Sequence, residues 1–91
     1  MIRNDLKTIL GGEFRFLASR TREQLGLTQR EMGERLQMSE SNYSDIETGE
    51  IHCCGTLTAV LLLGMQDDPV EFIHAINQKF QNWYAKEMLG V

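Results

Sequence analysis

Two helix starts lie close together near the middle of the chain, and they constrain the fold more than any other sequence feature. Thr28 is followed three residues later by Glu31, the spacing of a capping box, in which each side chain accepts a hydrogen bond from the other residue's backbone N–H. Ser39 is a favourable N-cap for a second helix. Only residues 37–39 separate that start from the end of the first helix, near Leu36. Helices joined by so short a turn must cross at a steep angle, which predicts a helix-turn-helix.

Apolar residues recur at helical spacing along the rest of the chain, which predicts an all-α fold. The chain has one proline and no strand-like alternation of apolar and polar residues. The breaker Gly11-Gly12 is expected to separate the first residues from the first long helix. The expected helices, in chain order, are 13–25, 28–36, 40–48, 57–65 and 68–88, of which the fourth is nearly all apolar and expected to be buried. The expected organisation is an N-terminal arm or short helix at 1–12, a helix-turn-helix domain at 13–66 and a long C-terminal helix within 67–91.

The net charge of −4 argues against nonspecific binding to nucleic acid, because contacts with phosphates need cations. The charge is unevenly distributed, however. Residues 1–37 hold seven of the nine Lys and Arg, whereas residues 38–91 hold two, against eight carboxylates. If the protein contacts phosphates, the first part of the chain must supply most of the cations.

Nothing in the sequence indicates a membrane or an oxidising compartment. No apolar run approaches the roughly 20 residues of a membrane span, and the N-terminus lacks the layout of a secretory signal. The two adjacent cysteines do not form a disulfide framework. We therefore expect a cytoplasmic protein without a membrane partner.

The sequence offers no constellation of catalytic or metal-binding residues. No nucleophile is paired with a base and an orienting group, and there is no glycine-rich phosphate loop. His52-Cys53-Cys54 could suggest a metal, but vicinal cysteines rarely coordinate one ion well, and no second Cys/His pair follows at zinc spacing. We expect no enzymatic activity, no cofactor and no metal, and ordinary free thiols at Cys53 and Cys54.

Several spaced features of the segment 27–49 occur together in one known family. They are the Leu-Thr-Gln opening at 27–29, the small residue Gly33, the serine before the second helix and the closing Ile-Glu-x-Gly at 46–49. The shared apolar positions are Met32, Leu36, Met38, Tyr43 and Ile46. With these features the chain resembles the Cro/CI-type helix-turn-helix proteins of the xenobiotic-response-element (XRE) family, over about residues 14–65. The resemblance implies a five-helix, lambda-repressor-like DNA-binding domain.

The resemblance also implies how the candidate site residues are used. In the family, the first exposed residues of the second helix contact bases in the major groove of double-stranded DNA, and the start of the first helix approaches the phosphates. Carried over by position, the base contacts are Glu40, Ser41, Asn42 and Ser44, and the residues near phosphates are Thr28, Gln29 and Arg30. The further candidate phosphate contacts are Arg15, Arg20 and Arg22. Glu47 is expected to have a structural role. The implied function is that of a sequence-specific transcriptional regulator, most simply a repressor.

Two departures from the family pattern matter. Gln37 occupies the turn position where the family usually has glycine, so left-handed strain is expected there. Family members often carry Arg or Lys within or just after the second helix, whereas this chain has Glu40, Asp45, Thr48 and Glu50. A carboxylate repels phosphates and suits a base edge only where it accepts from a cytosine amino group. A second reading therefore stays open, in which the fold is a protein-interaction module, such as a toxin-neutralising subunit or the partner of a basic regulator.

The predicted last helix is longer than a small core requires. About 20 residues make a helix about 30 Å long. Ile73 and Ile76 are expected to pack into the core against the first and fourth helices. The aromatic and apolar residues beyond them are expected to project as a dimer interface, namely Phe80, Trp83, Tyr84 and Met88. A homodimer would suit a palindromic DNA site, because a two-fold protein matches two-fold half-sites.

Overall fold

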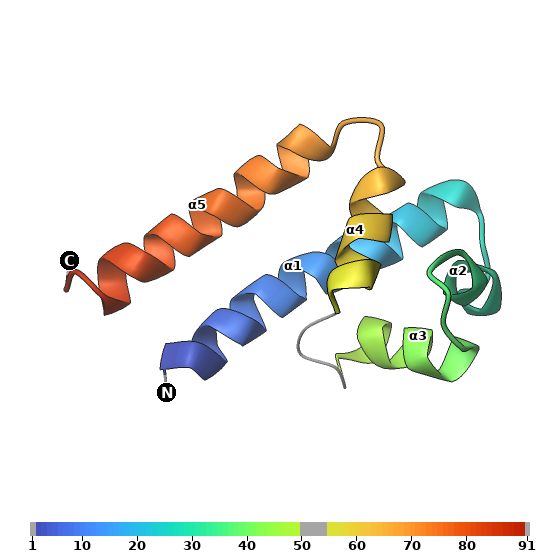
Figure 1. Cartoon of the computed structure of the whole chain (residues 1–91), viewed down its shortest axis with the longest axis horizontal. Coiled ribbons are helices and arrows are strands. Elements are labelled where there is room, and N and C mark those ends of the chain that lie inside the picture. The colour runs from blue at the N-terminus through green and yellow to red at the C-terminus, as the bar shows by residue number, and fades with distance from the viewer. Residues whose placement is uncertain (1, 50–54, 91) are drawn as a thin grey trace.

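The computed structural model describes residues 2–49 and 55–90, and within these ranges every regular element is a helix. The five helices are α1 (Ile2–Leu25), α2 (Gln29–Arg35), α3 (Glu40–Thr48), α4 (Thr56–Gly64) and α5 (Pro69–Glu87), as Figure 1 shows. The all-α, five-helix fold expected from the sequence is thus confirmed. The segment with His52, Cys53 and Cys54 lies outside the described residues, as does Glu50.

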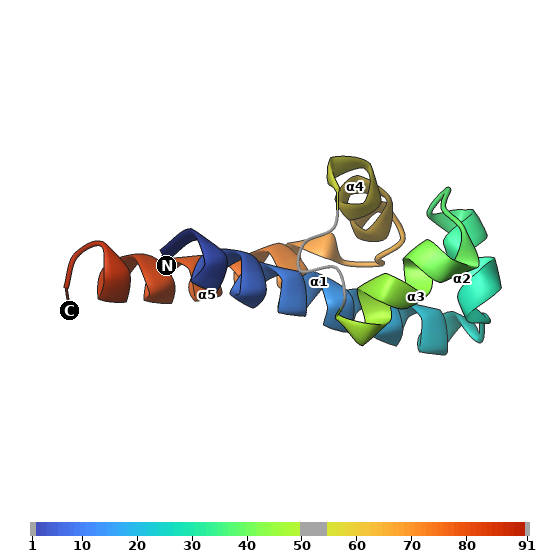
Figure 2. The same cartoon turned by 90° about the horizontal axis from the view of Figure 1, so that it is seen from below.

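The two long helices give the molecule its elongated shape, with extents of 44 × 27 × 19 Å. Helices α1 and α5 lie side by side and antiparallel, so that both ends of the chain are at the same end of the molecule (Figures 1 and 2). Helices α2 and α3 cross at the opposite end, beside the C-terminal half of α1. Helix α1 contacts α3, α4 and α5, so it is the common support of the fold.

The hydrophobic core forms where the helix-turn-helix meets α1, α4 and α5. The buried core residues are Leu17, Ala18, Met32, Leu36, Tyr43, Ile46, Leu62 and Phe72. Four of the five apolar positions predicted in the helix-turn-helix are in this group, and the fifth, Met38, is half-buried against it. Ile76 also packs against the core, as predicted.

The break predicted at Gly11-Gly12 is absent, because α1 continues through both glycines. Each glycine in a helix interior costs only about 1 kcal/mol relative to alanine. Contacts between α5 and the residues of α1 that follow the two glycines offset that cost. The rings of Phe14 and Phe72 pack edge to face with their centroids 5.0 Å apart, and Lys79 Nζ lies 3.6 Å from Glu13 Oε1. Residues 2–12 are therefore the first part of a 24-residue helix rather than a separate arm or helix.

Helix α4 is less buried than its apolar sequence predicts. Only Thr58 and Leu62 are buried, whereas Leu57 and Val60 are 56% and 59% exposed. A helix that packs on one side of a small core can bury only one face, whatever its composition. The prediction that the fourth helix is buried is therefore wrong for the face that carries Leu57 and Val60.

The turn between α2 and α3 contains the left-handed residue expected from the sequence. Gln37 has φ = 60°, a region that a residue with a Cβ atom adopts at a cost of about 1–2 kcal/mol. The turn is fixed by hydrogen bonds from the N–H of Gln37 to the carbonyl of Glu34 (3.1 Å) and from the N–H of Met38 to that of Gly33 (2.9 Å).

Replacing Gln37 by glycine should therefore stabilise the protein. We expect Gln37→Gly to raise the free energy of unfolding by about 0.5–1 kcal/mol, because relief of the strain exceeds the greater flexibility of glycine in the unfolded chain. Thermal unfolding followed by circular dichroism should show a midpoint a few degrees higher. Gln37→Ala is the matched control, since it removes the same polar group but keeps the Cβ atom. An equal gain from Gln37→Ala would contradict the strain argument.

Candidate nucleic-acid interface

A single carboxylate, that of Glu47 near the end of α3, joins three helices. Arg22 of α1 donates to it twice, from Nε to Oε2 at 2.6 Å and from Nη2 to Oε1 at 3.1 Å. Gln29 of α2 donates from Nε2 to Oε1 at 3.1 Å, and the hydroxyl of Tyr43 donates to Oε2. Arg22 also donates from Nη1 to the carbonyl of Leu27 at 3.1 Å. We call Arg22, Gln29, Tyr43 and Glu47 the Glu47 cluster, and it confirms the structural role expected for Glu47.

The electrostatics of this cluster keep its ion pair charged. Burial raises the pKa of Glu47, but the hydrogen bonds from Arg22, Tyr43 and Gln29 together outweigh it, so that the pKa lies below its ordinary value. The hydrogen bond to Glu47 raises the pKa of Arg22, and burial raises the pKa of Tyr43. At neutral pH the cluster therefore holds a carboxylate, a guanidinium and a neutral phenol, so the charges of Glu47 and Arg22 offset each other.

The start of α2 is fixed by the predicted capping box. Thr28 Oγ1 accepts from the N–H of Glu31 at 3.1 Å, and Glu31 Oε1 accepts from the N–H of Thr28 at 2.9 Å. The hydrogen bonds with Thr28 lower the pKa of Glu31. Of the candidate phosphate contacts in this helix, Gln29 is held by Glu47, whereas the side chain of Arg30 is accessible. The Arg30 side chain is 76% exposed, and its Nε atom lies 3.6 Å from Oε1 of Glu34. An ion pair this exposed contributes little energy, so a phosphate can displace it.

The first turn of α3 is exposed on one face, and the opposite face of α3 packs against α2. Ser39 Oγ accepts from the N–H of Asn42 at 3.1 Å, as expected for an N-cap. Glu40, Ser41 and Asn42 are exposed, and Ser44 is half-buried. Among the described residues the amide group of Asn42 has no hydrogen-bond partner. These four candidate base contacts therefore lie in the first two turns of one helix. The first three are accessible to a ligand, and the fourth is partly accessible.

Gly33 makes the close packing of α2 behind α3 possible. A Cβ atom added to it would lie 3.0 Å from the carbonyl oxygen of Met38 and 3.2 Å from that of Ser39. Both are backbone atoms of the turn itself. The sequence-based interpretation, in which Gly33 lets the helices approach closely, is thus confirmed.

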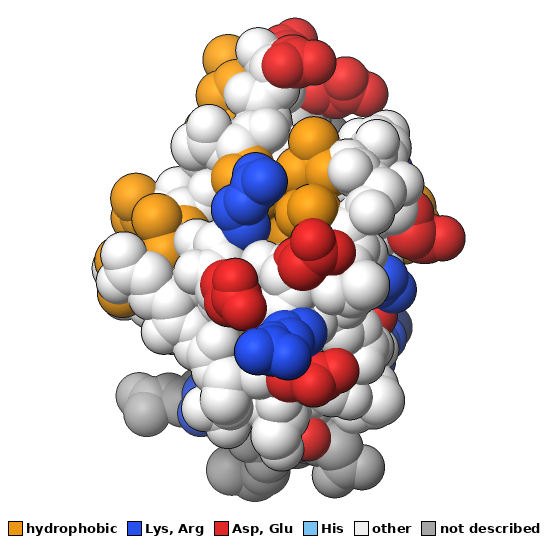
Figure 3. Space-filling view, turned by 90° about the vertical axis from the view of Figure 1, so that its right-hand side faces the viewer, with side chains coloured by type: hydrophobic (Ala, Val, Ile, Leu, Met, Phe, Trp, Pro, Cys, Tyr) orange, Lys and Arg blue, Asp and Glu red, His pale blue; other side chains and the backbone are white. Residues whose placement is uncertain are grey.

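The described residues at this end of the molecule form no continuous positive surface. Figure 3 views it from the side of α2 and α3 and shows Lys or Arg side chains interspersed with Asp and Glu. Residues 28–49 carry two cations and five carboxylates, which leaves a net charge of −3. Of the candidate phosphate contacts outside this segment, Arg22 is held by Glu47, whereas Arg15 and Arg20 are exposed on α1.

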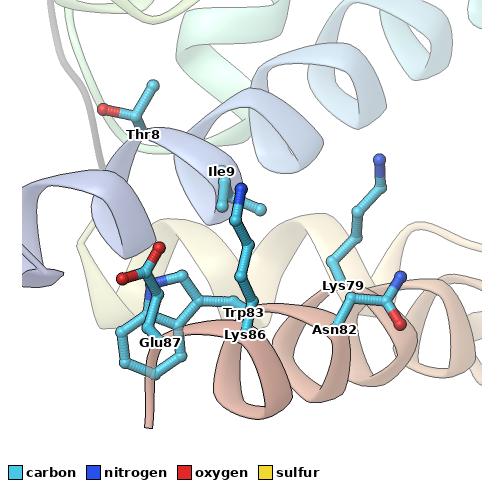
Figure 4. Close-up of a pocket in the computed structure, with 7 residues that line it drawn as sticks. All are labelled: Thr8, Ile9, Lys79, Asn82, Trp83, Lys86 and Glu87. Carbon is cyan, nitrogen blue, oxygen red and sulfur yellow. The ribbon is translucent and has the colours of Figure 1, made fainter. Parts of the chain in front are cut away.

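The residues expected at a dimer interface divide between two faces of α5. Phe80, Tyr84 and Met88 are exposed by 39%, 42% and 55%. Trp83 instead faces α1 across a groove of about 500 Å³, which Figure 4 shows. Its Nε1 atom is buried, with no hydrogen-bond partner in the part of the chain that the structure describes.

The exposed face of α5 also includes one residue that the sequence placed in the core and one to which it gave no role. Ile73 was expected in the core but is 51% exposed, and Val70 is 68% exposed. Helical spacing already aligns Ile73 with Phe80 and Tyr84, seven and eleven positions later. This alignment indicates that the three residues share one face of the helix. The spacing alone does not show which of the two apolar faces packs against α1.

No part of the described chain forms a helix long and apolar enough to cross a membrane. Searches of curated proteins and of solved structures found no match. The profile of a family described as "helix-turn-helix domain" matches residues 10–69, which is most of the chain and includes α2, α3 and α4. The chain therefore belongs to this helix-turn-helix domain family, within the XRE/Cro-like group.

Proposed function

We propose that the protein is a sequence-specific transcriptional regulator that binds double-stranded DNA as a homodimer, with α3 in the major groove. The observation that carries this proposal is the exposed first turn of α3, which the Glu47 cluster and Gly33 hold in a fixed position relative to α2. A rigidly supported helix that presents short polar side chains suits the reading of base edges. The proposed action is repression, by occupying a palindromic site at a promoter in the cytoplasm.

Each candidate residue has a chemical role in this proposal. The free amide of Asn42 can pair with the N6 and N7 positions of adenine, and Glu40 can accept from the amino group of cytosine. Ser41 and Ser44 can donate to or accept from either kind of base. Arg30 is the proposed phosphate contact, with Thr28 and Gln29 beside it at the start of α2.

Substitutions at Asn42 and Arg30 should separate base reading from phosphate binding. We expect Asn42→Ala to weaken binding to the selected site by about 1–3 kcal/mol and to leave binding to random DNA unchanged. Arg30→Ala should weaken binding to both alike and reduce the salt slope by about 1. Fluorescence anisotropy at about 50 mM and 200 mM salt, on DNA selected from a random pool, measures both effects.

Arg35→Ala is the matched control for Arg30→Ala, because it removes the same charge from the other end of α2. It should change binding less than Arg30→Ala does. Equal losses for Asn42→Ala on selected and random DNA would contradict a base-reading role for Asn42.

The net charge of residues 28–49 favours a second candidate function, that of a protein-interaction module for a basic partner. Such a partner would be a toxin or a basic regulator. In this case the protein would show no binding to DNA even at about 50 mM salt, where phosphate contacts are strongest. The same anisotropy measurement therefore decides between the two functions.

A further inference from the structure

Helix α5 carries two apolar faces, and α1 covers only one of them. Phe72, Ile76 and Trp83 face α1 and the core. The second face is exposed along the whole helix. We call this face the outer stripe; it consists of Val70, Ile73, Phe80, Tyr84 and Met88, exposed by 68%, 51%, 39%, 42% and 55%. Exposed apolar surface of this extent marks an interface.

We propose that the outer stripe packs against the outer stripe of a second copy, with the two α5 helices antiparallel and the two-fold axis between Asn77 and Phe80. This inference rests on the homodimer of the proposed function and adds its orientation and its contacts. It leaves the interface separate from the groove between α1 and α5.

The shape of the stripe favours pairing with itself in this orientation. Its N-terminal half presents two exposed aliphatic side chains, Val70 and Ile73. Its C-terminal half borders a groove of about 380 Å³, which is lined by Phe80 and Tyr84 of the stripe together with Gln81, Ala85 and Leu89. In a two-fold interface each patch meets its own copy, so the protruding half can fill the hollow half only if the helices are antiparallel.

The spacing of the stripe agrees with this pairing. If Ile73 lies opposite Tyr84 of the second copy, then Asn77 lies opposite Phe80 of the second copy, and Val70 comes beside Met88. Each apolar residue of the stripe thus meets another residue on the same face, and the one amide, Asn77, lies near the axis. A single polar residue at such a position sets the register of packed helices.

The charges and dipoles of α5 also favour the antiparallel arrangement. Carboxylates cluster at the start of α5, at Asp67, Asp68 and Glu71, whereas Lys79 and Lys86 of its C-terminal half line the groove toward α1. Antiparallel packing keeps the acidic end of one helix away from the acidic end of the other, and it also opposes the two helix dipoles. Parallel packing would place the three carboxylates beside their own copies. The outer stripe itself contains no charged residue, so a second copy meets no repulsion along it.

The available apolar area is of the size that a dimer needs. Side chains of this kind that are about half-exposed present about 100 Å² each, so the stripe with Leu89 offers about 600 Å². A standard interface buries about 800 Å² on each partner, and the polar rim of the stripe can supply the remainder.

Disulfide trapping tests the orientation directly. The two native cysteines are first replaced by serine, and Asn77→Cys, Ile73→Cys, Tyr84→Cys and Gln78→Cys are then made singly in that background. Antiparallel packing leaves the two copies of position 77 offset by only about 4.5 Å along the axis, but those of position 73 or 84 by about 16 Å, too far for a disulfide. Among the single variants, we expect only Asn77→Cys to form a covalent dimer on oxidation. An equal mixture of Ile73→Cys and Tyr84→Cys should cross-link although neither does alone.

Gln78→Cys is the control, because it lies close to the axis along the helix but off the outer stripe, and it should not cross-link. Circular dichroism of each reduced variant reports its folding. Cross-linking of Ile73→Cys with itself would indicate parallel helices and overturn the inference, and so would a monomeric mass in sedimentation. DNA binding by the reduced Cys53→Ser/Cys54→Ser background protein is measured separately, so failure of the antiparallel interface and failure of the proposed DNA binding are distinguishable.

Discussion

The Glu47→Ala variant is expected to lose about 2–3 kcal/mol of unfolding free energy. Removing the carboxylate leaves the guanidinium of Arg22, the amide of Gln29 and the hydroxyl of Tyr43 without their shared acceptor. Loss of one partner from a buried ion pair costs about 3–5 kcal/mol, and the 22% exposure of the Arg22 side chain reduces that figure. Chemical denaturation at pH 7 measures the loss, which is a large part of the stability of a domain of this size.

The same carboxylate should give the protein an acid-sensitive component of stability. Because the pKa of Glu47 is lower in the folded state, its contribution is complete above the unfolded-state value of about 4.3 and is lost as the pH falls through the folded value. Between pH 7 and pH 3 the stability of Glu47→Gln should therefore fall less than that of the wild type.

The exposed Glu34 provides the matched control for this titration. Glu34→Gln removes a carboxylate whose only ion pair, among the described residues, is the weak exposed one with Arg30, so it should leave the stability nearly unchanged. If Glu47→Gln lost stability on acidification as steeply as the wild type, the Glu47 cluster would not be the source of the acid sensitivity.

The Gly33→Leu variant is expected to lose about 3 kcal/mol or more, because the new side chain has no space between the helices. Its Cβ atom alone would lie 3.0 Å from the carbonyl oxygen of Met38 and 3.2 Å from that of Ser39. These are backbone atoms that hydrogen bonds hold in the turn, so α3 must move away from α2. Chemical denaturation should show the loss of stability, and DNA binding should fall with it, because α3 carries the proposed base contacts.

Gly64→Leu is the control for this substitution. Gly64 is the last residue of α4, and nothing lies within 4 Å of a Cβ atom placed there. The same change of residue type should therefore be neutral or slightly stabilising, because leucine has a higher helix propensity than glycine. Similar stabilities for Gly33→Leu and the wild type would show that α2 and α3 can separate at little cost.

The parts of the fold that short-range chemistry determines could be predicted from the sequence. Helices α2 and α3 begin and end within one residue of the prediction, because Thr28, Ser39 and Gly49 act on backbone groups only a few residues away. The strain at Gln37 was predicted instead from the resemblance, because the family usually has glycine at this turn position.

The features that sequence reasoning missed depend on contacts between distant residues. The two glycines of α1 are tolerated because α5 packs alongside, and the direction in which Trp83 points depends on how α5 is rotated about its axis. Arg22 and Glu47 are 25 positions apart. No local signal in the sequence shows that Arg22 is held by that carboxylate.

Helix α1 connects α5 to α3, because it contacts both helices at different points along its length. Phe14 packs against α5, and Arg22, eight positions later on the same helix, holds the carboxylate near the end of α3. Those eight residues span about 12 Å, and each residue of an α-helix turns the chain by about 100°. Insertion of a single residue between them would therefore swing α3 around the axis of α1 relative to α5, even if every contact at either end were kept. In a dimer held by α5, the number of residues in this part of α1 sets both the separation and the angle of the two α3 helices.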